Sequence, residues 1–170
     1  MYWRLSPKEY SPPGRGERNR RLLKALVDAR RVPGVLGYIR GEPVGWCAIG
    51  PREEYVRLRT SPYYARALAP VDHEPVWSVV CFFVKRPHRG QGYSLPLLKA
   101  AVAFARSQGA RIIEAYPLDK GSTACVPSYT GAVSTFKKLG FVEVARRYAH
   151  RPILRLYLHP GPSGHPASQP

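Results

Sequence analysis

The segment Arg89–Ser94, which reads Arg-Gly-Gln-Gly-Tyr-Ser, constrains the fold more than any other part of this 170-residue chain. It follows an apolar run, Val76–Val84, and leads into Ser94–Gln108, where apolar residues recur at helical spacing. Ser94 can act as the N-cap of this helix, and Arg111–Leu118 then predicts a second strand. Strand, helix and strand in this order predict a right-handed crossover with the glycine loop at its mouth.

This glycine loop is suited to binding an anion. The first amide groups of a helix have no internal partner, and the helix dipole places partial positive charge beside them. Gly90 and Gly92 let the backbone approach a ligand closely, and Arg89 adds a fixed charge. The sequence therefore predicts phosphate binding at Arg89–Ser94; the alternative is that the two glycines only form a turn.

A second motif follows later in the chain. Ala132–Phe141 reads Ala-Val-Ser-Thr-Phe-Lys-Lys-Leu-Gly-Phe and is typical of a helix that ends at Gly140. Val84–Ser94, which reads Val-Lys-Arg-Pro-His-Arg-Gly-Gln-Gly-Tyr-Ser, precedes it with one helix and one strand between. This ordered pair resembles the GNAT family of acyl-CoA-dependent N-acetyltransferases, over about residues 32–158.

The resemblance implies an α/β fold. We expect one GNAT-like domain over residues 1–158, with a central mixed, mostly antiparallel sheet flanked by helices and a β-α-β crossover that carries the pyrophosphate loop. Residues 159–170 are rich in Pro, Gly, Ser and His, and we expect them to form a disordered tail. Elsewhere we expect a loop over Ser6–Gly16, helices over Glu17–Arg31, Arg52–Leu58 and Tyr129–Leu139, a hairpin of Val35–Ile39 and Val44–Ile49, and closing strands over Phe141–Tyr148 and Pro152–Leu158.

The resemblance also implies acetyl-CoA as the cosubstrate. Its pantetheine arm would pair with exposed backbone at Phe82, Phe83 and Val84. The residues expected to bind the rest of the cofactor are Arg89, Gly90, Gln91, Gly92, Tyr93, Ser94 and Phe136.

Two departures from the family pattern affect the proton donor. Tyr129 stands where the family often has Asn, and Phe136 stands where it often has the Tyr that protonates the coenzyme A thiolate. Since Phe136 has no proton to give, the acid is Tyr129, Tyr116 or solvent.

No single base is evident either. Asp72, His73 and Glu74 precede the central strand and can act through a water, whereas Glu114 lies on the facing strand. Each of these residues can equally be structural. The catalytic candidates are therefore Glu74, His73 and Tyr129.

The long connection Pro51–Pro75 can be a flap over the acceptor. Tyr63, Tyr64 and Arg66 would supply stacking surface and an anion clamp, which suits an acceptor with a carboxylate or phosphate beside its amine. The alternative is a packed structural excursion.

Composition adds limits on location and partners. No apolar run is long enough to span a bilayer, and Cys47, Cys81 and Cys125 match neither a disulfide framework nor a metal site, so we expect a cytoplasmic protein with no metal. The formal net charge of +16 attracts anions, of which acetyl-CoA is one. A nucleic acid and a homodimer stay open as partners.

These observations predict an N-acetyltransferase that moves an acetyl group from acetyl-CoA to a primary amine of a small molecule or peptide by direct attack in a ternary complex. The alternatives are a catalytically weak acyl-CoA-binding regulator, which Phe136 permits, and a basic protein associated with nucleic acid. Lack of acidic surface disfavours a polycationic acceptor.

Overall fold

The computed structural model describes residues 1–11, 15–119 and 129–158. Its strands form one six-stranded sheet in the order β1-β2-β3-β4-β6-β5. All described neighbours are antiparallel except β3 and β4, which are parallel. This mixed, mostly antiparallel sheet confirms the predicted fold class. The strands are β1 (Gly34–Ile39), β2 (Glu42–Pro51), β3 (Trp77–Val84), β4 (Ile112–Ala115), β5 (Val142–Tyr148) and β6 (Arg151–Tyr157).

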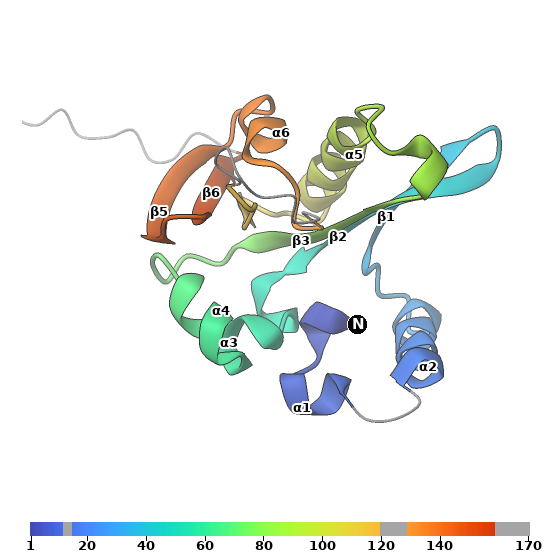
Figure 1. Cartoon of the computed structure of the whole chain (residues 1–170), viewed down its shortest axis with the longest axis horizontal. Coiled ribbons are helices and arrows are strands. Elements are labelled where there is room, and N and C mark those ends of the chain that lie inside the picture. The colour runs from blue at the N-terminus through green and yellow to red at the C-terminus, as the bar shows by residue number, and fades with distance from the viewer. Residues whose placement is uncertain (12–14, 120–128, 159–170) are drawn as a thin grey trace, which may run out of the picture.

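Helices cover both faces of the sheet (Figure 1). Helices α5 and α6 lie on one face, and η1 with α1–α4 lies on the other. The α-helices are α1 (Pro7–Tyr10), α2 (Arg15–Asp28), α3 (Arg57–Thr60), α4 (Pro62–Ala67), α5 (Ser94–Ser107) and α6 (Val133–Lys137). The 3-10 helices are η1 (Tyr2–Arg4), η2 (Arg52–Glu54) and η3 (Arg86–His88). None of the described helices has both the length and the apolar character that a membrane span needs.

Two hydrophobic clusters form the core, one on each side of the sheet. Successive side chains of a strand point to opposite faces, so Val79 packs toward α5 and Val80 toward α3 and α4. Cys47 is fully buried in the first cluster and Cys81 is half-buried beside the second, and both are free thiols. Cys125 lies outside the described residues.

The predicted crossover is present as β3, α5 and β4, but its details differ. Helix α5 begins at Ser94, and Tyr93 is the N-cap without a side-chain cap bond, so the expected N-cap role of Ser94 is wrong. Strand β4 ends at Ala115, earlier than expected, and only Leu118 continues its pairing through an isolated bridge.

Two other segments also differ from their sequence-based expectation. The late helix is shorter, because Gly131 at φ 88° and the extended Ala132 delay its start to Val133. The expected N-terminal loop contains α1, which a capping box stabilises: Ser6 accepts from the Glu9 amide, and the Glu9 side chain accepts from the Ser6 amide.

The connection between β2 and β3 is packed rather than loose. Its helices place Leu58, Tyr64, Ala67 and Leu68 in the second core cluster, against Val80. All four side chains are at most 8% exposed. This arrangement favours the structural excursion over a free flap.

Candidate active site

The glycine loop between β3 and α5 is shaped by two unusual backbone conformations. Gly90 and Gly92 have φ angles of 76° and 79°, in the left-handed region that favours glycine. A Cβ atom at either position would meet no heavy atom within 4 Å. The loop therefore needs glycine for its backbone shape, and the side on which a Cβ would project is open.

Side chains fix this loop against the end of β3. Arg89 Nε donates to the Val84 carbonyl at 2.9 Å, and Gln91 Nε2 donates to the Pro87 carbonyl at 3.0 Å. The segment 84–94 contains three Lys or Arg residues and no Asp or Glu. The 14-residue helix α5 follows at once, and its N-terminus places partial positive charge beside these basic side chains.

Strands β3 and β4 are paired over only part of their length. The parallel register joins Trp77–Val79 to Ile113–Ala115, whereas β3 continues to Val84. The β2–β3 register shifts at the same level, which leaves Val80 as an extra residue in β3. The two strands thus part beside a bulge, on the side that leads to the glycine loop.

The chain itself bridges the gap between the parted strands. The Phe82 amide donates to the Tyr129 carbonyl at 2.6 Å, and Ala132 forms a parallel bridge with Leu118. The expectation of exposed backbone over Phe82–Val84 is therefore wrong at Phe82, since this amide already has a partner. A ligand in the gap must either displace this contact or stop short of it.

The side chain of Phe136 packs beside the gap and has no exposed surface. It is fully buried, with its ring centre 5.9 Å from that of Phe82 and 5.2 Å from that of Phe141. A Cβ at Gly131 would lie 2.8 Å from the Phe136 ring and 3.0 Å from the Phe82 ring. Phe136 therefore positions Phe82 and the residues around Gly131 instead of meeting a ligand directly.

Tyr129 and Tyr64 come together at this gap. Their hydroxyl oxygens are 3.1 Å apart, and Tyr129 is 42% exposed. The rings of Tyr2 and Trp3 lie 6.1 and 6.2 Å from that of Tyr129. Burial raises the pKa of Tyr129, so its hydroxyl keeps its proton at neutral pH. The contribution of Tyr2 and Trp3 had no signal in the sequence beyond their aromatic character.

The other two predicted acceptor residues are placed differently. The Tyr63 hydroxyl lies 2.8 Å from His150 Nε2, and its ring stacks on Tyr148 at 5.6 Å, so Tyr63 joins α4 to the β5–β6 hairpin. Arg66 is exposed on α4. Of the three, Tyr64 is the one that the structure brings to Tyr129.

The candidate bases lie in a separate pocket at the start of β3. Asp72, His73 and Glu74 are exposed and line a cavity of about 490 Å³ together with Arg52 and Arg59. β3 has eight residues, so its two ends are about 25 Å apart. His73 and Glu74 are therefore near the paired end of β3, and the glycine loop is near the other.

Glu114 and Tyr116 are satisfied members of a buried polar network. Glu114 is 1% exposed and pairs with Arg52 at 3.1 Å and with Arg155 at 2.8 Å. The Tyr116 hydroxyl is 2.8 Å from both Ser78 Oγ and Glu114 Oε1, and burial raises its pKa. These contacts favour the structural alternative for Glu114, and they disfavour Tyr116 as the proton donor.

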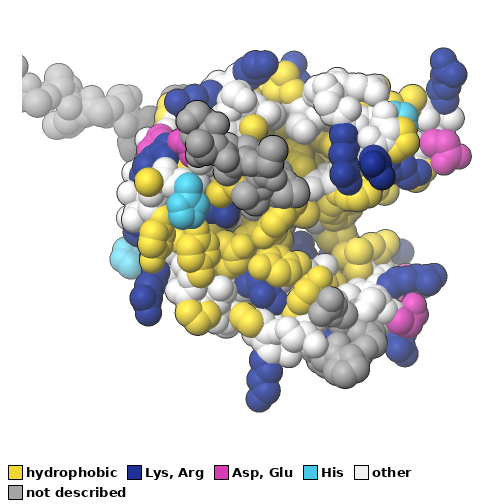
Figure 2. Space-filling model, in the orientation of Figure 1, with side chains coloured by type: hydrophobic (Ala, Val, Ile, Leu, Met, Phe, Trp, Pro, Cys, Tyr) yellow, Lys and Arg dark blue, Asp and Glu magenta, His cyan; other side chains and the backbone are white. Residues whose placement is uncertain are grey.

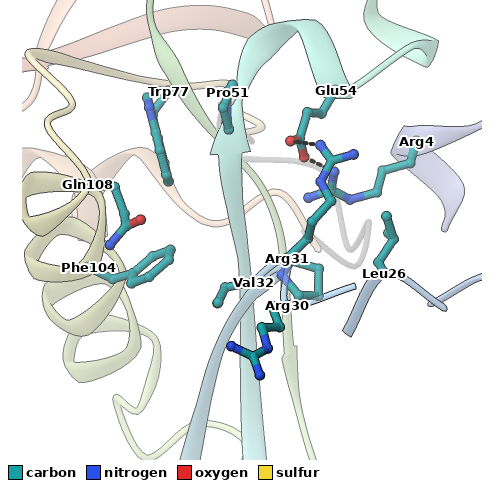
Figure 3. A pocket seen from close by; sticks show the side chains of 11 residues that line it. Arg4, Leu26, Arg30, Arg31, Val32, Pro51, Glu54, Trp77, Phe104 and Gln108 are labelled. Atoms are coloured by element: carbon teal, nitrogen blue, oxygen red, sulfur yellow. Dashed lines mark hydrogen bonds and ion pairs between the residues drawn. The ribbon is translucent and has the colours of Figure 1, made fainter. Parts of the chain in front are cut away.

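A further pocket, of about 250 Å³, also belongs to the start of β3 (Figure 3). Arg4 and Arg31 both pair with Glu54 on one side of it, and Trp77 and Phe104 stand on the other. Glu54 thus holds two of the cations that line this pocket, which lies away from the glycine loop.

The surface near the gap is largely apolar. Figure 2 shows hydrophobic side chains gathered across the middle of this face, between the sheet and helices α3 and α4. A small cavity of about 130 Å³ reaches the bulge, where Trp3, Tyr55, Val80 and Cys81 line it. An acceptor that approaches the parted strands from this side meets aromatic rather than acidic side chains.

Three solved structures are similar to this one in fold. The structure of yncA from Salmonella typhimurium with its cofactor acetyl-CoA superimposes with a TM-score of 0.54 at 16% identity, over 87% of this chain and 77% of that one. An N-acetyltransferase from Staphylococcus aureus Mu50 gives 0.52 at 17% identity, over 88% and 81%. A ribosomal-protein-alanine N-acetyltransferase from Brucella melitensis gives 0.51 at 16% identity, over 84% and 78%. At these identities the likeness is one of fold.

Sequence comparison decides the family. No curated protein matches the chain. The model of the acetyltransferase (GNAT) family, however, matches residues 1–141, which include the glycine loop, the parted strands and the late Gly-Phe motif. The chain belongs to the GNAT family of acetyltransferases, whose members use acetyl-CoA as their cosubstrate.

Proposed function

We propose that the protein transfers the acetyl group of acetyl-CoA to a primary amine of a small molecule or peptide, by direct attack while both substrates are bound. The observation that carries the proposal is that the glycine loop follows the end of β3 that parts from β4, where Phe82 contacts Tyr129. The pyrophosphate would lie at Arg89–Ser94 and the reactive end beside Tyr129. Acetyl-CoA supplies the activated acetyl group.

The reaction needs one proton removed and one supplied. The acceptor nitrogen forms a bond to the acetyl carbon as the carbon–sulfur bond breaks, the nitrogen loses a proton, and the released sulfur gains one. Tyr129 is the group best placed to give that proton, because it is half-exposed at the gap and protonated at neutral pH. Tyr116 is fully buried and already bonded, which disfavours it.

The base stays less defined than the acid. His73 and Glu74 are candidates that would need a chain of water from the pocket at the start of β3. The alternative is that the amine arrives already deprotonated from solvent. The distance of His73 and Glu74 from Tyr129 favours the second route, because these two residues line the pocket at the start of β3 and the rings around Tyr129 carry no base.

A second function, acyl-CoA binding with little catalysis, is favoured by two observations. The Phe82 amide is already bonded to Tyr129, and Phe136 carries no proton to donate. Such a protein would bind acetyl-CoA at the glycine loop without transferring the acetyl group.

One pair of measurements separates the two functions. Calorimetry measures acetyl-CoA binding, and a thiol reagent follows coenzyme A release as primary amines are added. Binding with amine-dependent thiol release supports the transferase, and binding without release from any amine supports the regulator. No binding of acetyl-CoA would contradict both.

A further inference from the structure

Arg151, the first residue of β6, is an arginine without a counter-charge beside the proposed reactive end. Its terminal nitrogen donates to two neutral oxygens, the Tyr116 carbonyl and Thr130 Oγ1, both at 3.2 Å. Its Nε is buried and has no hydrogen-bond partner among the described residues. The guanidinium is therefore only partly satisfied where it stands.

The other buried or half-buried arginines around the sheet are compensated. Arg155, four residues further along β6, pairs with both Asp72 and Glu114. Arg52 pairs with Glu114. Arg57 donates to two backbone carbonyls and lies over the ring of Tyr2 at 4.1 Å.

Arg52 and Arg155 have acidic partners, and Arg57 lies over an aromatic ring. Arg151 has neither kind of partner among the described residues. All 11 Asp and Glu residues of the chain lie within the described ranges, and none of them makes an ion pair with Arg151. A partly buried charge without a partner is costly, so an anionic ligand would gain much from meeting it.

The place of Arg151 ties it to the gap. Tyr116 directly follows β4, and Thr130 directly follows Tyr129, whose carbonyl bridges to Phe82. Burial raises the pKa of Tyr129, and the Arg151 charge opposes that rise. The β5–β6 hairpin that carries Arg151 also carries Tyr148 and His150, which contact Tyr63.

We infer that Arg151 binds a carboxylate of the acceptor, and that the acceptor is an amino acid with an aromatic or apolar side chain. The carboxylate would meet the guanidinium, the neighbouring amine would face Tyr129, and the side chain would lie against the tyrosine cluster. This inference rests on the proposed transferase function. It moves the expected anion clamp from Arg66, which is exposed on α4, to Arg151.

The test compares acceptors that differ only in the carboxylate. Phenylalanine and tryptophan are assayed against their C-terminal amides by acetyl-CoA-dependent thiol release, with the wild-type protein, Arg151→Met and Arg151→Lys. Arg147→Met is the matched control, because Arg147 lies on the same hairpin and also donates to backbone carbonyls, those of Ala69 and Pro70.

We expect the wild-type kcat/KM to favour the free acids over the amides by about tenfold or more, as for the loss of a charge-assisted hydrogen bond. Arg151→Met should abolish that preference mainly through KM of the acids, Arg151→Lys should keep part of it, and Arg147→Met should leave it intact. Acetyl-CoA binding, followed by calorimetry, should be similar in all four proteins.

Three results would overturn the inference. The first is wild-type turnover of the amides equal to or faster than that of the acids. The second is an equal loss for acids and amides in Arg151→Met, which would make Arg151 a structural support. In both, transfer itself persists and the proposed function stands. The third is acetyl-CoA binding with no transfer to any acceptor, which would remove the proposed function and this inference with it.

Discussion

At the scale of single residues, the two tyrosines considered as proton donors have opposite surroundings. Tyr116 is fully buried and its hydroxyl is held by Ser78 and Glu114. Tyr129 is 42% exposed, and its hydroxyl lies 3.1 Å from that of Tyr64. Burial alone would raise the pKa of both, but only Tyr129 can reach a bound substrate.

Tyr129→Phe should therefore lower kcat by on the order of 100-fold, the usual contribution of a positioned acid. Because burial raises the pKa of Tyr129, the phenol stays protonated until the pH exceeds the ordinary pKa of a tyrosine. The wild-type rate should thus fall only above about pH 10, and the variant should lack that fall. The measurement is a pH–rate profile of both proteins at saturating acetyl-CoA.

Tyr116→Phe is the control for this assignment. It should cost about 1–3 kcal/mol of stability, because it leaves buried partners unsatisfied, while kcat stays near normal. A large fall of kcat in Tyr116→Phe with a normal Tyr129→Phe would reverse the two roles. Normal kcat in both variants would assign the proton to solvent.

Gly92 offers a test of the cofactor loop at the same scale. Gly92→Ala forces a residue with a Cβ into φ 79° and should redirect the amides that face the pyrophosphate. Gly109→Ala makes the same kind of change at φ 82°, also with no neighbour within 4 Å, at the other end of α5. Both should destabilise by about 1 kcal/mol. Only Gly92→Ala should weaken acetyl-CoA in calorimetry, and equal affinities in the two variants would refute the loop assignment.

At the scale of elements, the sequence predicts the crossover well and the segment that bridges the gap poorly. β3, the glycine loop and α5 could be predicted because each has a local signal: an apolar run, two glycines and a helical repeat. The bridge from Tyr129 to Ala132 could not, because its hydrogen bond to Phe82 joins residues 47 positions apart and depends on where β3 and β4 separate. The sequence pattern of the late helix extends back to Tyr129, so it predicts helix where the bridging segment lies.

The same limit explains the candidate bases and Arg151. Proximity in sequence to β3 suggested His73 and Glu74, but a strand carries its two ends far apart. Arg151 lay in a turn-like His-Arg-Pro stretch with nothing to distinguish it from other arginines. Its lack of a carboxylate is a property of the folded charge pattern, which no local window contains.

Gly131 tests whether the bridging segment matters to the site. A Cβ at this position would lie 2.8 Å from the Phe136 ring, and the φ of 88° is unfavourable for alanine. Gly131→Ala should therefore lower Tm by about 4–8 °C, as the sum of strain and clash. Gly41→Ala, at φ 83° with nothing within 4 Å, measures the strain alone and should cost less. Equal shifts of Tm in the two variants would mean that the segment around Gly131 relaxes to avoid the clash without further loss of stability. Hydrogen exchange at the Phe82 amide should rise in Gly131→Ala and stay protected in Gly41→Ala.

At the scale of the whole molecule, the basic residues behind the net charge of +16 differ in whether they have acidic partners. Acidic side chains are largely engaged in ion pairs: Glu17 meets Arg20 and Arg21, and Lys24 meets Asp28 along α2. The basic face of α2 is thus partly neutralised, which favours an ordinary amphipathic helix over a helix dedicated to nucleic acid. Exposed cations such as Lys85 and Arg86 lie instead beside the glycine loop.

This distribution predicts how acetyl-CoA finds its site. The unpaired positive charge should attract the anionic cosubstrate over a distance comparable to the Debye length, which is about 10 Å at 0.1 M salt. The association rate, followed by stopped-flow fluorescence, should fall by about tenfold between low salt and about 0.5 M salt. Acetyl-pantetheine, which lacks the phosphates, should show little change under the same conditions.

Arg86→Gln should reduce the salt dependence for acetyl-CoA more than Arg20→Gln, because Arg86 stands next to the loop and Arg20 is paired on α2. If acetyl-pantetheine shows the same dependence, or if Arg20→Gln has the larger effect, the charge of this protein acts through general solubility and not by guiding its cosubstrate.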